Sequence, residues 1–217
     1  MSELSPLIPE TTYHIYNHAN GSENLFRTDE NYRYFLQKYG EYIYPIAETY
    51  AYCLMSNHFH LMVQIRSEEE VMAFFRKKIL ASKDPKAAQD LQGFQNLEGL
   101  KVEGLIGQQF SNFFNAYSKA YNKMYDRKGS LFIPRFKRKS VENDRYFTQL
   151  IAYIHLNPVK NGFCKHILDW PHSSIHAYYH DKASKLNRSY LQEWFGDKES
   201  LIAFHDSLEV DDSLFEF

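Results

Sequence analysis

The chain has 217 residues, of which 44% are hydrophobic, and a formal net charge of -2. This length and hydrophobic content are enough for one substantial core, and the overall charge does not indicate a polyanionic partner. Cys53 and Cys164 are the only cysteines, and their spacing is not typical of a zinc knuckle or a disulfide framework. There is no N-terminal signal pattern and no apolar run near the roughly 18 residues of a membrane span, so a cytoplasmic protein is expected.

The first third of the chain predicts the order strand, helix, strand, strand. Residues 12–17 alternate in polarity and are rich in β-formers, which favours a strand. Residues 28–43 open on Thr28 as N-cap and carry apolar side chains at helical spacing, and Pro45 ends this helix. Residues 46–57 and 58–65 then predict two strands joined in a hairpin-like pair.

The remaining elements are mainly helical. Residues 67–80 and 108–125 predict two helices, separated by an insertion at 81–104 that is partly helical. Residues 130–141 are extended and basic. Residues 143–157 predict a further helix, which Pro158 and Gly162 terminate.

This order predicts an α+β protein with a ferredoxin-like βαββαβ core, an antiparallel sheet and extra C-terminal helices. We expect one domain over residues 1–180, with an acidic and aromatic appendage at 181–217. The appendage could cover a basic groove as a brake, pack as a helical addition, or mediate self-association. The helical addition is the favoured interpretation.

Charge is distributed unevenly along the chain, with a basic middle and an acidic C-terminal tail. The basic residues between positions 117 and 139, opposed only by Asp126, are Lys119, Lys123, Arg127, Lys128, Arg135, Lys137, Arg138 and Lys139. Such asymmetry is typical of a nucleic-acid surface, although a run of charges can also be a solvated face.

Two histidines in the apolar stretch CLMSNHFHLMV need an explanation. On a strand, His58 and His60 point to the same face, and neutral imidazoles are favoured metal ligands. The other interpretation is that each is a partly buried histidine with a hydrogen-bond partner. Tyr153 and Asn157 share one face of the helix at 143–157, where packing and an ordinary helix end are the alternatives.

Several ordered motifs carry a resemblance to a known family. SNHFHLMV, residues 110–139, YIHLNPVKNG and DWPHSSIHAYY together resemble the single-tyrosine HUH transposases, specifically the REP-associated tyrosine transposases. The resemblance spans about residues 13–179. The chain departs from the family in having Ile133 and Pro134 before Arg135, and in the length of the insertion at 81–104.

The resemblance implies a site and a reaction. It implies that His58, His60 and Asn157 bind a divalent cation, Mg²⁺ or Mn²⁺, and that Tyr153 is the nucleophile. A phenol with a pKa near 10 is mostly protonated at neutral pH, so it needs surroundings that favour the phenolate in order to act as a nucleophile. It further implies cleavage and rejoining of single-stranded, hairpin-forming DNA through a 5′-phosphotyrosine, with the basic residues of the middle segment contacting phosphates. We expect a monomer rather than a homodimer.

Two other functions remain open. The chain could be a non-cleaving regulator that binds DNA hairpins, but the intact His58, His60, Tyr153 and Asn157 favour an enzyme. It could also be an unrelated metal hydrolase, for which a carboxylate ligand is expected and none is evident.

Other tyrosines are weaker candidates for the nucleophile. Tyr117, Tyr121 and Tyr125 lack a ligand-capable residue one turn later and predict a helix that is half core and half DNA-facing. Tyr13 and Tyr16 are interpreted as strand packing. His155 is expected to point away from the catalytic face.

Overall fold

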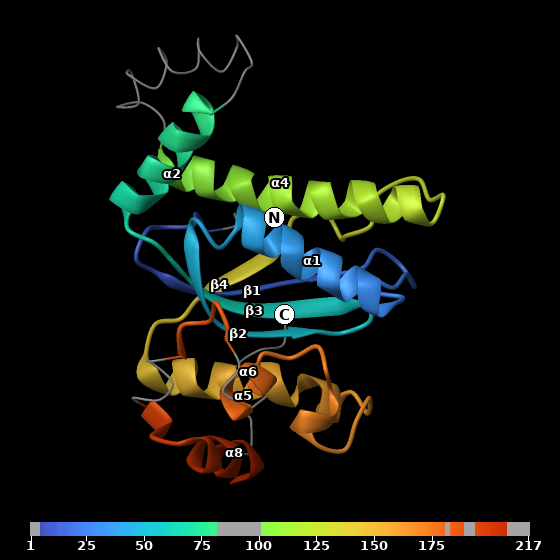
Figure 1. Ribbon diagram of the computed structural model, residues 1–217, viewed down its shortest axis with the longest axis vertical. Coiled ribbons are helices and arrows are strands. Elements are labelled where there is room, and N and C mark those ends of the chain that lie inside the picture. The colour runs from blue at the N-terminus through green and yellow to red at the C-terminus, as the bar shows by residue number, and fades with distance from the viewer. Residues whose placement is uncertain (1–4, 82–100, 181–182, 189–193, 208–217) are drawn as a thin grey trace.

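A four-stranded antiparallel sheet forms the centre of the molecule, with helices on both faces (Figure 1). The computed structural model describes residues 5–81, 101–180, 183–188 and 194–207. The strands are β1 (Thr12–His18), β2 (Ala47–Leu54), β3 (His58–Ile65) and β4 (Lys137–Ser140), in the order β2-β3-β1-β4. This is the predicted ferredoxin-like arrangement, and the α+β fold class is confirmed.

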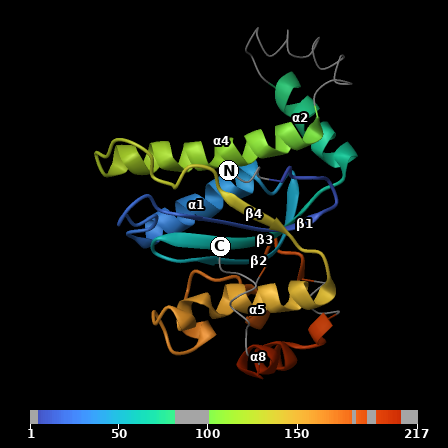
Figure 2. The same cartoon turned by 180° about the vertical axis from the view of Figure 1, so that it is seen from behind.

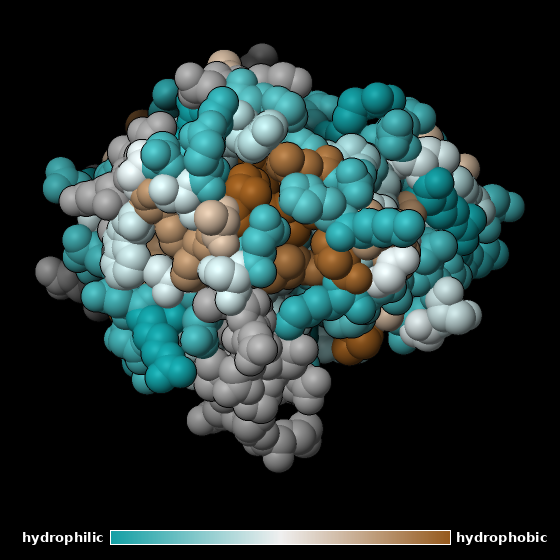
Figure 3. All heavy atoms as spheres, turned by 90° about the horizontal axis from the view of Figure 1, so that it is seen from below, coloured by the Kyte–Doolittle hydropathy of each residue, from teal (hydrophilic) through white to brown (hydrophobic). Residues whose placement is uncertain are grey.

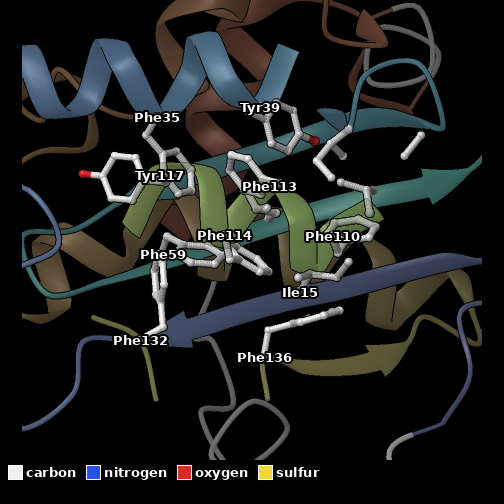
Figure 4. Close-up of a cluster of buried hydrophobic side chains, with 14 of the residues drawn as sticks. Ile15, Phe35, Tyr39, Phe59, Phe110, Phe113, Phe114, Tyr117, Phe132 and Phe136 are labelled. Atoms are coloured by element: carbon white, nitrogen blue, oxygen red, sulfur yellow. The ribbon is translucent and has the colours of Figure 1, made fainter. Parts of the chain in front are cut away.

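Two long helices cover one face of the sheet. α1 (Asp29–Tyr42) begins after the N-cap Thr28 and packs against α4 (Val102–Met124), while α2 (Glu68–Leu80) contacts the N-terminal part of α4. Figure 4 shows aromatic rings from α1, α4 and β3 filling the space between these helices and the sheet. The rings of Phe35 and Phe113 lie 4.9 Å apart near the centre of this cluster.

The opposite face is covered by the C-terminal helices. These are α5 (Asp144–Lys160), the short η2 (Ile167–Asp169), α6 (Ile175–Tyr179) and α8 (Lys198–Ser207). α5 packs directly on β2 and β3, and α8 packs on α5, as the view from behind also shows (Figure 2). From the α8 end, apolar residues gather at the centre of the surface and polar residues surround them (Figure 3).

Strand alternation separates two kinds of side chain on β3. Phe59, Leu61 and Val63 belong to the aromatic core beneath α1 and α4. His58 and His60 share the opposite face with Met62, which packs against α5. Pairing of β1 with β3 places the even-numbered residues of β1, namely His14, Tyr16 and His18, on the same face as these histidines.

Two helix boundaries differ from those predicted. α4 begins at Val102 rather than Gln108, because Val102 and Ile106 extend the buried stripe that continues at Phe110. α5 continues through Pro158 to Lys160. A proline removes one backbone hydrogen bond, and a helix that is buried against a sheet tolerates this loss in its last turn.

Other expectations fall partly outside the described residues. Residues 82–100, which make up most of the predicted insertion, are not among them. Within the appendage at 181–217, a helix is observed at Lys198–Ser207, as favoured from the sequence. Among the described helices, none is both long and apolar enough to cross a membrane.

The aromatic core predicts a clear difference between two apolar truncations. Phe113→Ala should lower the free energy of unfolding by about 3–5 kcal/mol, because it leaves a cavity among packed rings. Leu80→Ala is the control, since this side chain is 72% exposed, and it should change stability by less than about 0.5 kcal/mol. Urea denaturation measures both, and equal losses would contradict the assignment of the core.

Candidate metal and tyrosine site

A cluster of polar side chains lies between the sheet and α5. β3 supplies His58 and His60, α5 supplies Tyr153 and Asn157, and β1 supplies His14. Both predicted histidines and Asn157 are buried, whereas Tyr153 is half-buried. Residues separated by nearly 100 positions in the sequence are therefore brought together within one chain.

His58 has an amide oxygen at each ring nitrogen. Its Nε2 lies 2.9 Å from Oδ1 of Asn157, and its Nδ1 lies 2.8 Å from Oδ1 of Asn57. The side-chain amide of Asn161 also donates to Oδ1 of Asn157 at 3.2 Å, which orients that amide. The ring of His18 stacks on His58 at 4.6 Å and fixes its plane.

His60 is held through its ring nitrogen Nδ1. Its Nδ1 lies 2.9 Å from Nε2 of His14, and the hydrogen bonds of the described residues leave Nε2 of His60 unused. The His58 and His60 rings are nearly perpendicular, with their centres 5.3 Å apart.

Tyr153 approaches the same histidines from α5. Its ring meets His60 edge to face at 5.3 Å and meets His14 at 6.1 Å. Nζ of Lys160, two turns later on α5, is 5.9 Å from the centre of the Tyr153 ring. The predicted convergence of the tyrosine with the histidine pair is thus present in the structure, while the role of each residue stays a prediction.

Burial keeps the histidines of this site neutral near pH 7. Loss of solvent lowers the pKa of His58 to about 4, and the contact with Asn157 opposes this shift only in part. Burial and the neighbouring histidines hold the pKa of His60 well below its usual range. Neutral imidazoles present lone pairs, which is the form that binds cations.

The spacing of the possible ligand atoms fits a divalent cation. A neutral imidazole has one N–H, so His58 can donate to only one of its two amide oxygens. If Nδ1–H donates to Asn57, two acceptors, Nε2 of His58 and Oδ1 of Asn157, face each other at 2.9 Å. Two ligands at right angles around Mg²⁺, each at about 2.1 Å, are about 3 Å apart. Within the described part of the chain, no group of three or more His, Cys, Asp or Glu side chains could hold a metal ion. A cation bound by His58 and His60 would therefore need Asn157 as its third protein ligand.

Three neighbours in β1 were missed in the sequence. His14, Tyr16 and His18 line the histidine face, with the Tyr16 ring 5.7 Å from His60. Tyr16 does pack, as predicted, but it packs on the site itself. The signal was present as alternation, since these residues occupy every second position of a strand. Whether these residues lie on the same face as His58 depends on the register between β1 and β3.

The competing tyrosines and His155 have structural contacts. The hydroxyl of Tyr117 donates to the carbonyl of Leu25, and that of Tyr125 to Oδ1 of Asn31, so this stripe packs on the chain around α1 rather than facing outward. His155 is buried on the far side of α5, bonded to His205 and to Ser174. It points away from the tyrosine site, as expected.

The predicted basic segment divides into distinct environments. Lys137 and Lys139 pair with Tyr16 and His14 and share the histidine face of the sheet, whereas Arg138 pairs with Ile15 on the other face. The exposed Lys119 and Arg135 line a groove of about 540 Å³ between α4 and residues 129–136.

The other members of the basic segment differ in their contacts. Arg127 is tied to Glu23 at 2.9 Å and to Asn122. Lys123 and Lys128 are exposed. The eight cations therefore lie in several different local environments.

The fold and the site define a class of protein: a ferredoxin-like domain whose central strand carries a His-x-His motif beside a tyrosine on a packed helix. Comparison with known proteins specifies this class further. A candidate REP-associated tyrosine transposase of Haemophilus influenzae is 24% identical over 154 residues, which cover 71% of this chain and 69% of that protein. The REP-associated tyrosine transposase of Escherichia coli is 35% identical over 68 residues, which cover 31% of this chain and 38% of that protein.

The fold comparison agrees. A solved structure of a REP-associated tyrosine transposase bound to a REP hairpin matches with a TM-score of 0.53 and 19% identity, covering 85% of this chain and 92% of that one. No family model matches the chain. The chain is thus similar in sequence and in fold to REP-associated tyrosine transposases, and the resemblance carried by its sequence motifs is confirmed.

The neutral buried histidines predict a loss of stability in mild acid. Burial lowers the pKa of His14 to about 3 and that of His58 to about 4, whereas unfolded histidine has a pKa near 6.5. The unfolded chain therefore binds more protons below pH 6.5, so stability is complete above that pH and is lost as the pH falls toward the folded values.

Urea denaturation at pH 7.5, 6.5, 5.5 and 5.0 tests this expectation. The free energy of unfolding should fall over the lower three values. His205→Gln removes another buried histidine whose pKa burial lowers, and it should make the dependence on pH shallower. A free energy that stays constant from pH 7.5 to 5.0 would mean that these histidines are not buried and neutral.

Proposed function

We propose that the chain is a metal-dependent single-stranded DNA endonuclease and strand transferase of the transposase type, acting on hairpin-forming DNA. The main supporting observation is the edge-to-face contact of Tyr153 with His60. It lies beside the close approach of Nε2 of His58 to Oδ1 of Asn157. The names of the relatives and the hairpin bound to the structural neighbour support the choice of substrate.

In the proposed reaction, Tyr153 is the nucleophile. Its phenol oxygen attacks a phosphorus atom of the strand, the bond from phosphorus to the 3′ oxygen breaks, and a 5′-phosphotyrosine forms. The phenol proton passes to solvent, and the departing oxygen takes up a proton to become a 3′-hydroxyl. One phosphoester replaces another, so a different 3′-hydroxyl can reverse the step and join strands without ATP.

His58, His60 and Asn157 are the residues that would hold a cation. Bound Mg²⁺ or Mn²⁺ would supply a Lewis acid for the oxygens of the scissile phosphate. The chain itself orients the donors, since Asn161 fixes the amide of Asn157 and the ring of His18 fixes His58. Tyr153 is only half-buried, so a DNA strand could reach it from the surface.

The proposed site is complete in a monomer. α5 and β3 belong to the same chain, and α5 packs on β2 and β3 directly. Lys137 and Lys139 lie on the same side of the sheet as the histidines, where they can contact phosphates of a strand that approaches Tyr153. In this proposal, Lys119 and Arg135 contact a second part of the DNA in the groove that they line.

Tyr153→Phe should abolish formation of a covalent protein–DNA adduct while leaving hairpin binding within a few-fold of wild type. The substitution removes only the attacking oxygen. The measurement is denaturing electrophoresis after incubation with labelled hairpin single strands and Mn²⁺, and Tyr121→Phe is the matched control.

Two other outcomes of this experiment would contradict the proposal. An adduct that persists in Tyr153→Phe would identify another nucleophile. If wild type binds hairpins tightly but forms no adduct with any of a panel that includes hairpins flanking its own gene, a non-cleaving regulator becomes the better description.

We expect some of the basic residues to contribute to DNA affinity and others to the stability of the fold. Replacing both Lys137 and Lys139 by Ala should lower the slope of log affinity against log salt by about 1.4, since a phosphate contact with a single strand contributes about 0.7. Arg127→Ala should instead destabilise the fold, because it breaks contacts to Glu23 and Asn122. Fluorescence anisotropy over a salt series and urea denaturation measure the two effects. Equal slopes in wild type and the double variant would exclude phosphate contacts at these lysines.

A further inference from the structure

One buried side chain next to the site has no role in the reaction described so far. His14 in β1 is completely buried, and its Nε2 lies 2.9 Å from Nδ1 of His60. Its ring also packs against Tyr16 at 4.8 Å and contacts Tyr153 at 6.1 Å. A strand that only needed to fill this space could use an apolar residue, as Ile15 does on the other face.

The contact between the two histidines restricts where their protons lie. A neutral imidazole carries one proton, so a hydrogen bond between two neutral rings requires one nitrogen to donate and the other to accept. If Nδ1–H of His60 donates to His14, Nε2 of His60 keeps a lone pair. In the opposite arrangement, Nε2 of His60 carries the proton and cannot bind a cation.

His58 shows the same arrangement with a different partner. Its Nδ1 faces Oδ1 of Asn57 and its Nε2 faces Oδ1 of Asn157; if Nδ1–H donates to Asn57, Nε2 keeps the lone pair. Both histidines of the pair then offer Nε2, and each is anchored through Nδ1. Partners of this kind fix the tautomer and ring orientation of metal-binding histidines.

We propose that His14 is a positioning residue of the site, which accepts the Nδ1–H of His60 and thereby holds His60 in the tautomer that presents Nε2 to a cation. This inference rests on the proposed function for its purpose, but the tautomer itself is a property of the protein without metal. His14 does not touch DNA or the reacting atoms in this proposal, because it acts only through His60.

Nitrogen chemical shifts of ¹⁵N-labelled histidine test the tautomer without cation or DNA. In wild type at pH 7.5, His60 should carry its proton on Nδ1 and none on Nε2. His14→Met removes the acceptor at similar bulk and should shift His60 toward the Nε2–H form. His14→Gln restores an acceptor near the position of Nε2 and should restore the wild-type signals. A wild-type His60 protonated on Nε2 would overturn the inference.

Mn²⁺ binding, followed by electron paramagnetic resonance, tests the consequence. His14→Met should bind Mn²⁺ about 10–100-fold more weakly than wild type, and His14→Gln should be within a few-fold of wild type. Tyr39→Phe is the control, since it removes one buried hydrogen bond, to Thr49, beneath the opposite helices. It should leave Mn²⁺ binding unchanged.

The two proposals fail in different ways. Equal Mn²⁺ affinity in wild type and His14→Met, or equal weakening by Met and Gln, would reduce His14 to a packing residue and overturn the inference. Wild type that binds Mn²⁺ no better than His58→Ala would overturn the metal site of the proposed function. The nitrogen shifts separate these cases, because they are recorded without metal.

Discussion

Strand β3 is buried on both faces, and this constraint determines how the rest of the molecule is built around it. One face needs apolar partners, which the aromatic rings of α1 and α4 supply. The other face carries two imidazoles, and a buried polar group is costly unless it has a hydrogen-bond partner. Asn57, Asn157 and His14 lie within hydrogen-bond distance of these rings. Since two of these partners lie on β1 and α5, their contacts with the histidines also fix how those elements pack.

α5 is held from two sides, which makes the position of Tyr153 well defined. Toward the sheet, Asn157 contacts His58. On the far side, His155 bonds to Ser174 at 2.7 Å and to His205 at 2.9 Å, and the hydroxyl of Ser174 also accepts the backbone N–H of Tyr52 in β2. The appended helix α8 thus supports α5 through a buried hydrogen-bonded chain. A site on an element held in this way keeps its geometry better than a site on a loop.

The sequence was sufficient for features that depend on local periodicity. Alternation placed His58 and His60 on one face, helical spacing placed Tyr153 and Asn157 together, and the element order indicated the sheet. The contribution of His14 depends on the register between β1 and β3, two strands separated by a helix and a third strand, and no local pattern encodes that register. The division of the basic segment among different environments also depends on the fold. Adjacent residues on a strand point to opposite faces, and the partner of Arg127 is Glu23, about 100 positions away.

The two borders of the sheet are protected differently. The border at β2 is covered by the chain itself, since Cys53 bridges to Ser173 and the N–H of Asn187 donates to Thr49. At the other border, β4 is only four residues long, and no further strand pairs with it among the described residues. Exposed backbone along such a border invites strand addition by another copy, which short length and lysines discourage. The short length of β4 and its lysines, Lys137 and Lys139, are therefore features that disfavour such pairing between molecules.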